Sequence, residues 1–204
     1  SGTGMHMHFS VLDRDGRNIF DDGTEAGSEM LRSAIAGCLD AMQDETLIFA
    51  PHGNSYDRFV PGAHAPTGIS WAYENRTAAI RVPAGPGKAR RIEHRVAGGD
   101  VNPYLFIGAV LGAALVGIED KLTPPPPVTG NAYALDLPRV TDDWGRAIGQ
   151  FETSGLLRRI EGVCHASPRP IIVKEVGAGI SGRIARSLVD AGVQGIDVAG
   201  LGGN

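Results

Sequence analysis

The feature that most constrains the fold of this chain is a strongly apolar stretch at residues 104–118. Asn102 and Pro103 precede it, and a capping asparagine followed by proline at the first helical position is a strong helix start. The stretch is shorter than the roughly 20 residues that a helix needs to cross a bilayer, and three charged residues follow it. It therefore predicts a helix to about Leu122 that is buried in a protein rather than in a membrane.

The overall composition narrows the classes of partner. A hydrophobic fraction of 42% and a charged fraction of 21% are typical of a soluble globular protein. The net charge of -4 gives no electrostatic reason to expect a nucleic acid or an anionic membrane as partner. Cys38 and Cys164 lie far apart without metal-ligand spacing, and no leader-like segment opens the sequence, so we expect reduced thiols and a cytoplasmic location.

The spacing of apolar residues predicts an α+β domain over residues 1–160. Residues 5–9 alternate as in a strand that places His6 and His8 on one face, where they could bind a metal or simply be hydrogen-bonded strand residues. Further strands are predicted at 47–50, 80–82 and 91–96, and helices at 25–42 and 144–160. We expect a mainly antiparallel sheet packed by two long helices, with the prolines at 124–127 as a stiff surface connector.

The pattern changes after about residue 160. A β-branched run at 171–173, a helix capped by Ser181 and ending before Gly192, and a second strand at 195–198 predict a βαβ unit with parallel strands. A single unit of this kind cannot cover both faces of its strands. We therefore expect residues 161–204 to be a segment distinct from the first 160.

Charged residues mark candidate binding positions on two of the predicted strands. Arg91, Glu93 and Arg95 share one face, where three charges are costly to bury unless they are paired or bound to ions; an exposed ladder of ion pairs is the alternative. Arg76 and Arg81 differ in parity, so both face one site only if Arg76 lies in the preceding turn or at a bulge. Guanidinium groups bind phosphate and carboxylate in a bidentate fork, although a single arginine is more often a surface residue.

Five motifs in order resemble the catalytic domain of the glutamine synthetase family. They are Gly4-Met5-His6-Met7-His8-Phe9-Ser10, Asn54-Ser55-Tyr56-Asp57-Arg58-Phe59-Val60-Pro61-Gly62, Asn75-Arg76-Thr77-Ala78-Ala79-Ile80-Arg81-Val82-Pro83, Arg91-Ile92-Glu93-His94-Arg95 and Asn102-Pro103-Tyr104-Leu105. The resemblance implies the C-terminal part of that domain, in an enzyme that forms a homo-oligomer. It also implies ligation of glutamate, through its γ-carboxylate, to an amine or ammonia, with ATP and Mg2+ or Mn2+ as cofactors.

The resemblance further implies a role for each matching position. The positions fall into four groups, namely metal ligands (His6 and Glu93), residues near the nucleotide (His8 and Ser10), residues that hold phosphate oxygens of ATP (Arg76 and Arg81), and residues that orient glutamate and its γ-phosphate (Arg58 and Arg95). These roles agree with the chemistry, because phosphoryl transfer is mostly positioning and neutralisation of oxygen charge by cations.

One departure from the family pattern concerns the amine acceptor. In ammonia-using members the loop after the Pro-Gly pair carries a glutamate that binds ammonium, whereas His64 stands there in this chain. Residues 71–77 and 96–100 are similar to the γ-glutamylputrescine synthetase branch. We therefore expect a putrescine-like amine rather than ammonia, with Arg58, Arg76, Arg95 and His64 as candidate catalytic residues; the alternative is that His64 is an ordinary loop residue.

Two further departures concern the ends of the resemblance. The N-terminal domain of the family and its glutamate-rich metal strands have no counterpart in these 204 residues, so we expect the chain alone not to catalyse ligation. Residues 165–204 resemble instead one βαβ piece of the FMN-dependent type 2 isopentenyl diphosphate isomerases, a (β/α)8-barrel family, with Lys174 near the flavin. Flavin binding by a single piece is not expected. An isomerase fragment, or a chimeric fragment without independent activity, are the alternative hypotheses.

Overall fold

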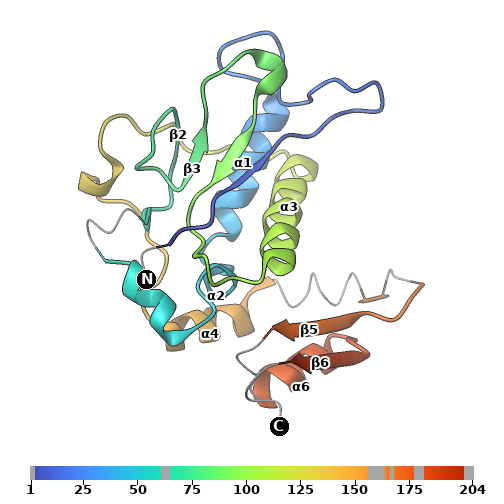
Figure 1. The fold of residues 1–204 in the computed structure, drawn as a ribbon. Coiled ribbons are helices and arrows are strands. Elements are labelled where there is room, and N and C mark those ends of the chain that lie inside the picture. The colour runs from blue at the N-terminus through green and yellow to red at the C-terminus, as the bar shows by residue number, and fades with distance from the viewer. Residues whose placement is uncertain (1–2, 61–64, 156–163, 166–167, 177–181, 200–204) are drawn as a thin grey trace. The chain divides into compact units, whose positions relative to one another are not determined.

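A computed structural model describes residues 3–60, 65–155, 164–165, 168–176 and 182–199 of the chain (Figure 1). The chain divides into two compact units, Ser1–Asp143 and Trp144–Asn204. The predicted junction of two family-like segments near residue 160 remains a prediction. In the described part of the chain, no helix has both the length and the apolar character that crossing a membrane requires.

A four-stranded sheet forms one layer of the first unit. Its strands are arranged in the order β1-β4-β3-β2, with the bounds Met7–Phe9 (β1), Trp71–Tyr73 (β2), Ile80–Val82 (β3) and Ile92–His94 (β4). β4 pairs antiparallel with β1 and β3, while β2 and β3 are parallel. The sheet is therefore mainly antiparallel, as predicted, and β2 is a strand that the sequence pattern did not predict.

Two long helices lie together on one side of this sheet (Figure 1). They are α1, Glu29–Ala41, and α3, Pro103–Glu119. Their contact is close: a Cβ atom built on Gly37 of α1 would lie 2.1 Å from the backbone oxygen of Ala113, and one on Gly117 of α3 would lie 2.2 Å from that of Ser33. Only glycine allows the two backbones to approach this far.

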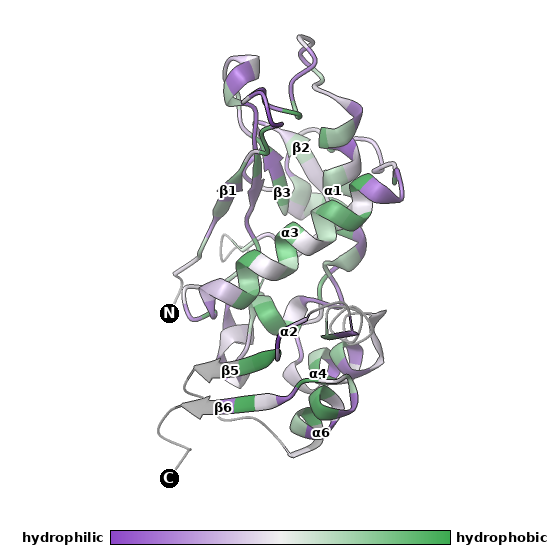
Figure 2. Cartoon of the chain, turned by 90° about the vertical axis from the view of Figure 1, so that its right-hand side faces the viewer, coloured by the Kyte–Doolittle hydropathy of each residue, from purple (hydrophilic) through white to green (hydrophobic). Residues whose placement is uncertain are grey.

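The apolar stretch that follows Asn102 forms α3, as predicted. The side chain of Asn102 accepts hydrogen bonds from Tyr104 N and Leu105 N, and the helix ends at Glu119 rather than at Leu122. Although most of its residues are apolar (Figure 2), only one face is buried. The prediction of a fully buried helix is therefore wrong for the opposite face, whose exposed residues include Tyr104, Leu105, Ile107, Leu111 and Leu115.

Two local predictions need correction. Residues 47–50 were expected to form a strand, but Thr46–Phe49 is a short helix, α2, because Phe49 and Thr46 bury their side chains on one helical face. A run of four apolar residues fits either structure, so its local pattern does not decide. α1 begins at Glu29 instead of residue 25, because the hydroxyl of Ser28 accepts from Leu31 N and caps the helix there.

The proline connector lies at the surface, as predicted, but it is also fixed to β2. The indole Nε1 of Trp71 donates to the carbonyl oxygen of Pro125 at 2.6 Å, and Val128 N donates to the carbonyl oxygen of Trp71 at 2.9 Å. The chain then continues into a short 3-10 helix, η3, Ala132–Ala134. The connector thus brings residues 128–130 alongside the end of β2, where they border the candidate site.

The second unit contains the predicted βαβ arrangement. Strands β5, Ile172–Val176, and β6, Gly195–Ala199, pair in parallel, and helix α6, Gly182–Asp190, lies between them in sequence. Gly192 follows the helix with φ at +92°, as expected of a glycine that ends a helix. The predicted cap, Ser181, lies outside the described residues, and the likeness of this unit to a flavin-dependent barrel remains a prediction.

Helix α4, Trp144–Thr153, precedes these elements and begins where the sequence predicted. The rest of that predicted helix, to residue 160, includes positions outside the described residues.

Candidate functional site

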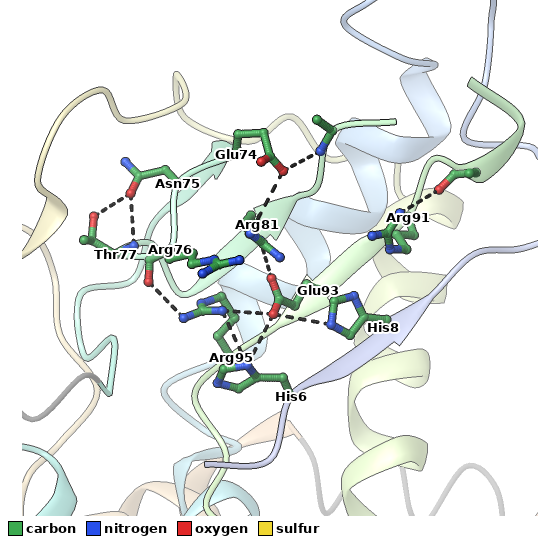
Figure 3. Close-up of polar contacts among 12 residues, drawn as sticks. His6, His8, Glu74, Asn75, Arg76, Thr77, Arg81, Arg91, Glu93 and Arg95 are labelled. Carbon is green, nitrogen blue, oxygen red and sulfur yellow. Dashed lines mark hydrogen bonds and ion pairs between the residues drawn. The ribbon is translucent and has the colours of Figure 1, made fainter. Parts of the chain in front are cut away.

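The centre of the candidate site is Glu93, a carboxylate that the sheet buries to 2% exposure. It lies on β4 directly opposite Arg81 of β3, whose Nε donates to Oε2. Arg95 Nη1 donates to Oε1 at 2.9 Å, and its Nη2 donates to the carbonyl oxygen of Arg76 at 3.0 Å (Figure 3). One carboxylate therefore holds two buried arginines, which is the paired arrangement that the strand pattern required.

The charge balance of this cluster favours the ionised carboxylate. Burial alone would raise the pKa of Glu93, but the Arg95 charge and the hydrogen bond from Arg81 outweigh it and hold the pKa below its usual value. Glu93 therefore stays negative at neutral pH, and with its two arginines it forms a group of one net positive charge.

The two histidines of β1 border the same carboxylate. His8 lies opposite Glu93 in the antiparallel register, its Nε2 is 3.4 Å from Oε1, and His6 Nδ1 is 3.3 Å from that same oxygen. Burial, and then the charge of Arg95, lower the pKa of His6, and Glu93 only partly offsets this. The contact between His6 and Glu93 is therefore one between a neutral imidazole and a carboxylate. Both side chains remain more than a third exposed, so ligands in solution can reach them.

An open cavity of about 660 Å3 lies beside the cluster, and Arg76 and Arg81 are among the residues that line it. Arg76 lies in the turn between β2 and β3. The sequence pattern allowed Arg76 and Arg81 to face one site only if Arg76 lay in this turn or at a bulge. Asn75 fixes that turn: its Oδ1 accepts from Thr77 N at 3.0 Å, and its Nδ2 donates to the carbonyl oxygen of Gly130 at 2.7 Å. The remaining wall comes from β2 and the connector, and the lining residues are Tyr73, Glu74, Asn75, Arg76, Arg81, Val128, Thr129 and Gly130.

Not every predicted residue joins this cluster. Arg91 was expected to share a face with Glu93, but β4 begins only at Ile92, and Arg91 Nη1 instead donates to the carbonyl oxygen of Ala89 at 3.2 Å (Figure 3). Ser10 is exposed directly after β1. His64 lies outside the described residues, so its role remains a prediction.

Arg58 is held by a separate part of the first unit. It ends a short 3-10 helix, η1, Gly53–Arg58, and its Nη2 donates to the carbonyl oxygens of Val96 and Ala97, both at 3.2 Å. The residue is 7% exposed, and burial lowers the pKa of its guanidinium, which the nearby Asp100 opposes. Its buried Nη1 has no hydrogen-bond partner among the residues that the structure describes.

Sequence reasoning did not assign a role to Glu74 or His94. Glu74 borders the cavity with φ at +48°, accepts from Ala84 N and lies 4.0 Å from Arg81 Nη1. The only signal was its place next to the Asn75-Arg76 motif. His94 is fully buried against the ring of Phe49 at 4.7 Å between centroids, and burial lowers its pKa to about 3, so it is a neutral core residue.

The donors around Glu93 fit part of a site for a divalent metal ion. A neutral imidazole nitrogen and a carboxylate oxygen 3.3 Å apart are about the distance expected for adjacent ligands of an ion with bonds near 2.1 Å. Imidazole and carboxylate together suit Mg2+ less well than Mn2+. Across the described ranges no group of three or more His, Cys, Asp or Glu side chains is arranged to hold a metal ion. His6 and Glu93 could therefore supply only a share of the ligands, and both oxygens of Glu93 already accept from arginines.

Comparisons with known proteins identify the family of the first part of the chain. Residues 1–163 match the catalytic domain of glutamine synthetase. The gamma-glutamylethanolamide synthetase of Streptomyces coelicolor is 43% identical over 157 residues, which are 77% of this chain and 34% of that protein. The gamma-glutamylputrescine synthetase of Escherichia coli is 38% identical over 170 residues, 81% of this chain and 35% of that protein. The glutamine synthetase of Pyrococcus furiosus is 46% identical over 134 residues, 66% and 30% respectively.

A solved structure described as apo GmaS without ligand has the same fold, with a TM-score of 0.67 and 28% sequence identity. The comparison covers 76% of this chain and 36% of that one. The chain thus spans about a third of the length of the relatives it matches. With four-fifths of its residues matched to the catalytic domain, the chain belongs to the glutamine synthetase family.

Proposed function

We propose that this chain is part of an enzyme that ligates glutamate, through its γ-carboxylate, to an amine with the use of ATP and a divalent metal ion. The observation that carries the proposal is the buried Glu93, which holds Arg81 and Arg95 and is bordered by His6 and His8. Such a cluster presents cationic groups beside an open cavity, and phosphoryl transfer depends mostly on groups of this kind.

Each side chain has a role that its surroundings allow. His6 and Glu93 would hold the metal ion, which when bound neutralises charge on phosphate oxygens. Arg76 and Arg81 line the cavity and would bind phosphate oxygens. Arg95 bonds to both Glu93 and the Arg76 carbonyl, so its guanidinium is fixed in place to orient an acidic substrate group.

Three more residues complete the proposal. The spare Nη1 donor of Arg58 would take a carboxylate of glutamate. His8 and Ser10, which are exposed on and after β1, would lie near the nucleotide.

A putrescine-like amine is the proposed acceptor in preference to ammonia. Two relatives in the comparison are named for ethanolamide and putrescine products, although glutamine synthetases match as well. His64 supports the organic amine because a carboxylate is the better partner for ammonium. The proposal does not extend to residues 164–204, which lie outside the family match.

Binding of Mn2+ and ATP to the purified chain tests the site. Mn2+ should broaden the side-chain NMR signals of His6 and His8. In His6→Ala the broadening of the remaining His8 signal should weaken at least about tenfold, because one of the two proposed protein ligands is removed. His165→Ala is the matched control, since this histidine lies in the second unit and should not matter. Unchanged broadening in His6→Ala would refute the metal assignment.

A product assay tests the reaction itself. The chain is incubated with ATP, Mg2+ or Mn2+, L-glutamate and either putrescine or ammonium, and γ-glutamyl products are measured by mass spectrometry. We expect no turnover from the isolated chain. Metal- and ATP-dependent turnover by the isolated chain would show that this expectation is wrong. The amine preference is tested with a complete enzyme that carries this loop, where equal efficiency with ammonium and putrescine would show that the preference is wrong.

A further inference from the structure

The turn after β4 is bonded to both ends of η1. At the start of η1, Ser55 Oγ accepts from His52 N at 3.0 Å and donates to Asp100 Oδ2 at 2.5 Å. At the other end, the guanidinium of Arg58 donates both protons of Nη2 to carbonyl oxygens of residues 96 and 97. This 3-10 helix has only six residues, so these contacts, more than its own backbone, fix its orientation.

Gly98 lies between the two charged groups of this contact. A Cβ atom built on Gly98 would be 2.3 Å from Asp100 Oδ1 and 2.7 Å from Arg58 Nη1. The carboxylate oxygen and the guanidinium nitrogen therefore lie no more than about 5 Å apart, on either side of a space that only glycine leaves open. Any side chain here would displace Arg58 or Asp100.

The arrangement leaves one donor of Arg58 unused. Nη2 is satisfied by two carbonyls, while the buried Nη1 has no partner within the described part of the chain. A buried donor without a partner destabilises the folded chain, because it has lost its hydrogen bonds to water. That cost is recovered when an acceptor arrives, and a carboxylate accepts the strongest bonds from a guanidinium.

We propose that the turn at residues 96–100 positions Arg58 for an acidic group of the substrate, with Asp100 and Gly98 as the positioning residues. Asp100 acts through Ser55: it fixes the start of η1, so that Arg58 at the end of η1 meets the two carbonyls with Nη1 left free. Gly98, which has no Cβ, lets the Arg58 guanidinium and the Asp100 carboxylate keep positions from which any side chain would displace them. The inference rests on the proposed function, since it assumes that this acid is glutamate.

The side chain of Arg58 itself provides the first test. In NMR spectra of the full chain, restricted rotation of the guanidinium should give separate signals for the Nη2 protons, assigned by their loss in Arg58→Lys. Asp100→Ala and Gly98→Ala should merge these signals. Gly99→Ala is the matched control, because the three atoms nearest to a Cβ there all belong to Thr3, at 3.0 Å or more, and not to Arg58 or Asp100.

Titration with L-glutamate provides the second test. Asp100→Ala should weaken the glutamate-induced shift of the Arg58 signals about tenfold, as expected when a binding group is misplaced by a fraction of an ångström. Asp100→Asn should restore binding to within about twofold of the wild type, because its amide oxygen can still accept from Ser55. If Asp100→Asn instead behaves like Asp100→Ala, the charge of Asp100 rather than positioning is what matters, and the proposal is wrong.

Ser55→Ala removes the same link without touching the turn, and it replaces Gly98→Ala if that variant does not fold. Unchanged Arg58 signals in both Asp100→Ala and Ser55→Ala, with native backbone spectra, would overturn the proposal. A wild-type Arg58 signal that does not respond to glutamate would count against the proposed function, while the rotation of the guanidinium in the variants would still decide the positioning role.

Discussion

Replacing Glu93 by glutamine should destabilise the first unit far more than the same change at Glu74. Both carboxylates lie near Arg81, but Glu93 is buried whereas Glu74 is exposed to solvent. Glu93 is 2% exposed, and both of its oxygens accept from arginines. The side chain of Glu74 is 54% exposed and lies 4.0 Å from Arg81 Nη1. The pair therefore separates the effect of burial from the effect of contact with the same arginine.

The expected magnitudes follow from this difference. Glutamine at position 93 would remove the buried counter-charge that Arg81 and Arg95 share, and leave Arg81 only the exposed Glu74 at 4.0 Å. Removing one partner of a buried charge pair costs about 3–5 kcal/mol. An exposed ion pair contributes about 0–1 kcal/mol, because solvent screens it. We therefore expect at least a threefold difference in the loss of unfolding free energy.

Urea denaturation measures the two losses. The fluorescence of Trp71, which is 2% exposed on β2, reports on the first unit once Trp144 of the second unit is replaced by phenylalanine in every variant, and far-UV circular dichroism reports on the helices. With a slope of about 2 kcal/mol per molar urea, Glu93→Gln should lower the midpoint by about 2 M and Glu74→Gln by less than about 0.5 M. Equal shifts in the two variants would refute the assignment of Glu93 as a buried structural anion.

A double variant provides an independent test of the contact between Glu93 and Arg81. Combining it with Arg81→Met removes one buried cation together with the anion. The double variant should then be more stable than the sum of the two single losses predicts, because the two residues interact directly. Strict additivity would contradict the interaction.

Three further predictions concern the core. Gly37→Ala should lower the unfolding free energy, measured by thermal unfolding, by about 1–3 kcal/mol, because its Cβ would lie 2.1 Å from a backbone oxygen of α3. Gly112→Ala, whose Cβ would have nothing within 4 Å, should instead stabilise α3 by up to about 1 kcal/mol. A change of the same sign in both variants would contradict the close packing. His94→Leu should raise the unfolding free energy by about 1 kcal/mol, because neither ring nitrogen has a partner among the described residues, and a loss would show that the imidazole is needed. Cys38, whose burial raises the pKa of its thiol, should resist Ellman's reagent in the folded chain while the part-exposed Cys164 reacts, and equal rates would show that Cys38 is not buried.

Local sequence signals predicted the elements that local chemistry determines. The cap at Asn102 and the proline after it predicted the start of α3, because both act within one helical turn. The parity of Arg76 and Arg81 predicted that Arg76 would lie in a turn if both faced one cavity, and the structure meets that condition. Short-range geometry was sufficient in these cases.

Other features depend on contacts between distant segments, which no local pattern contains. The apolar residues 47–50 fit a strand or a helix, and tertiary packing of Phe49 decided for the helix. Arg91 has the right parity for the charged face, but the pairing of β4 begins only at Ile92 with β1 and at Glu93 with β3. The bond between Arg58 and the turn after β4 joins residues 38 positions apart, so the sequence could indicate the arginine but not what holds it.

The arginines of this unit differ in how much of their charge is available to a ligand, and this difference bears on how the site would work. Arg81 and Arg95 share one buried carboxylate, so with Glu93 they carry a single net positive charge, which the exposed Glu74 at the rim of the cavity partly offsets. The neutral His6 adds none. Arg76, in the exposed turn, therefore supplies most of the remaining attraction for a phosphate, and exposed charges are screened at physiological salt. With so little net charge, the side chains around the cavity orient an anion better than they attract it. We therefore expect the affinity for a nucleotide without added metal to be weak, and to fall further as the salt concentration is raised.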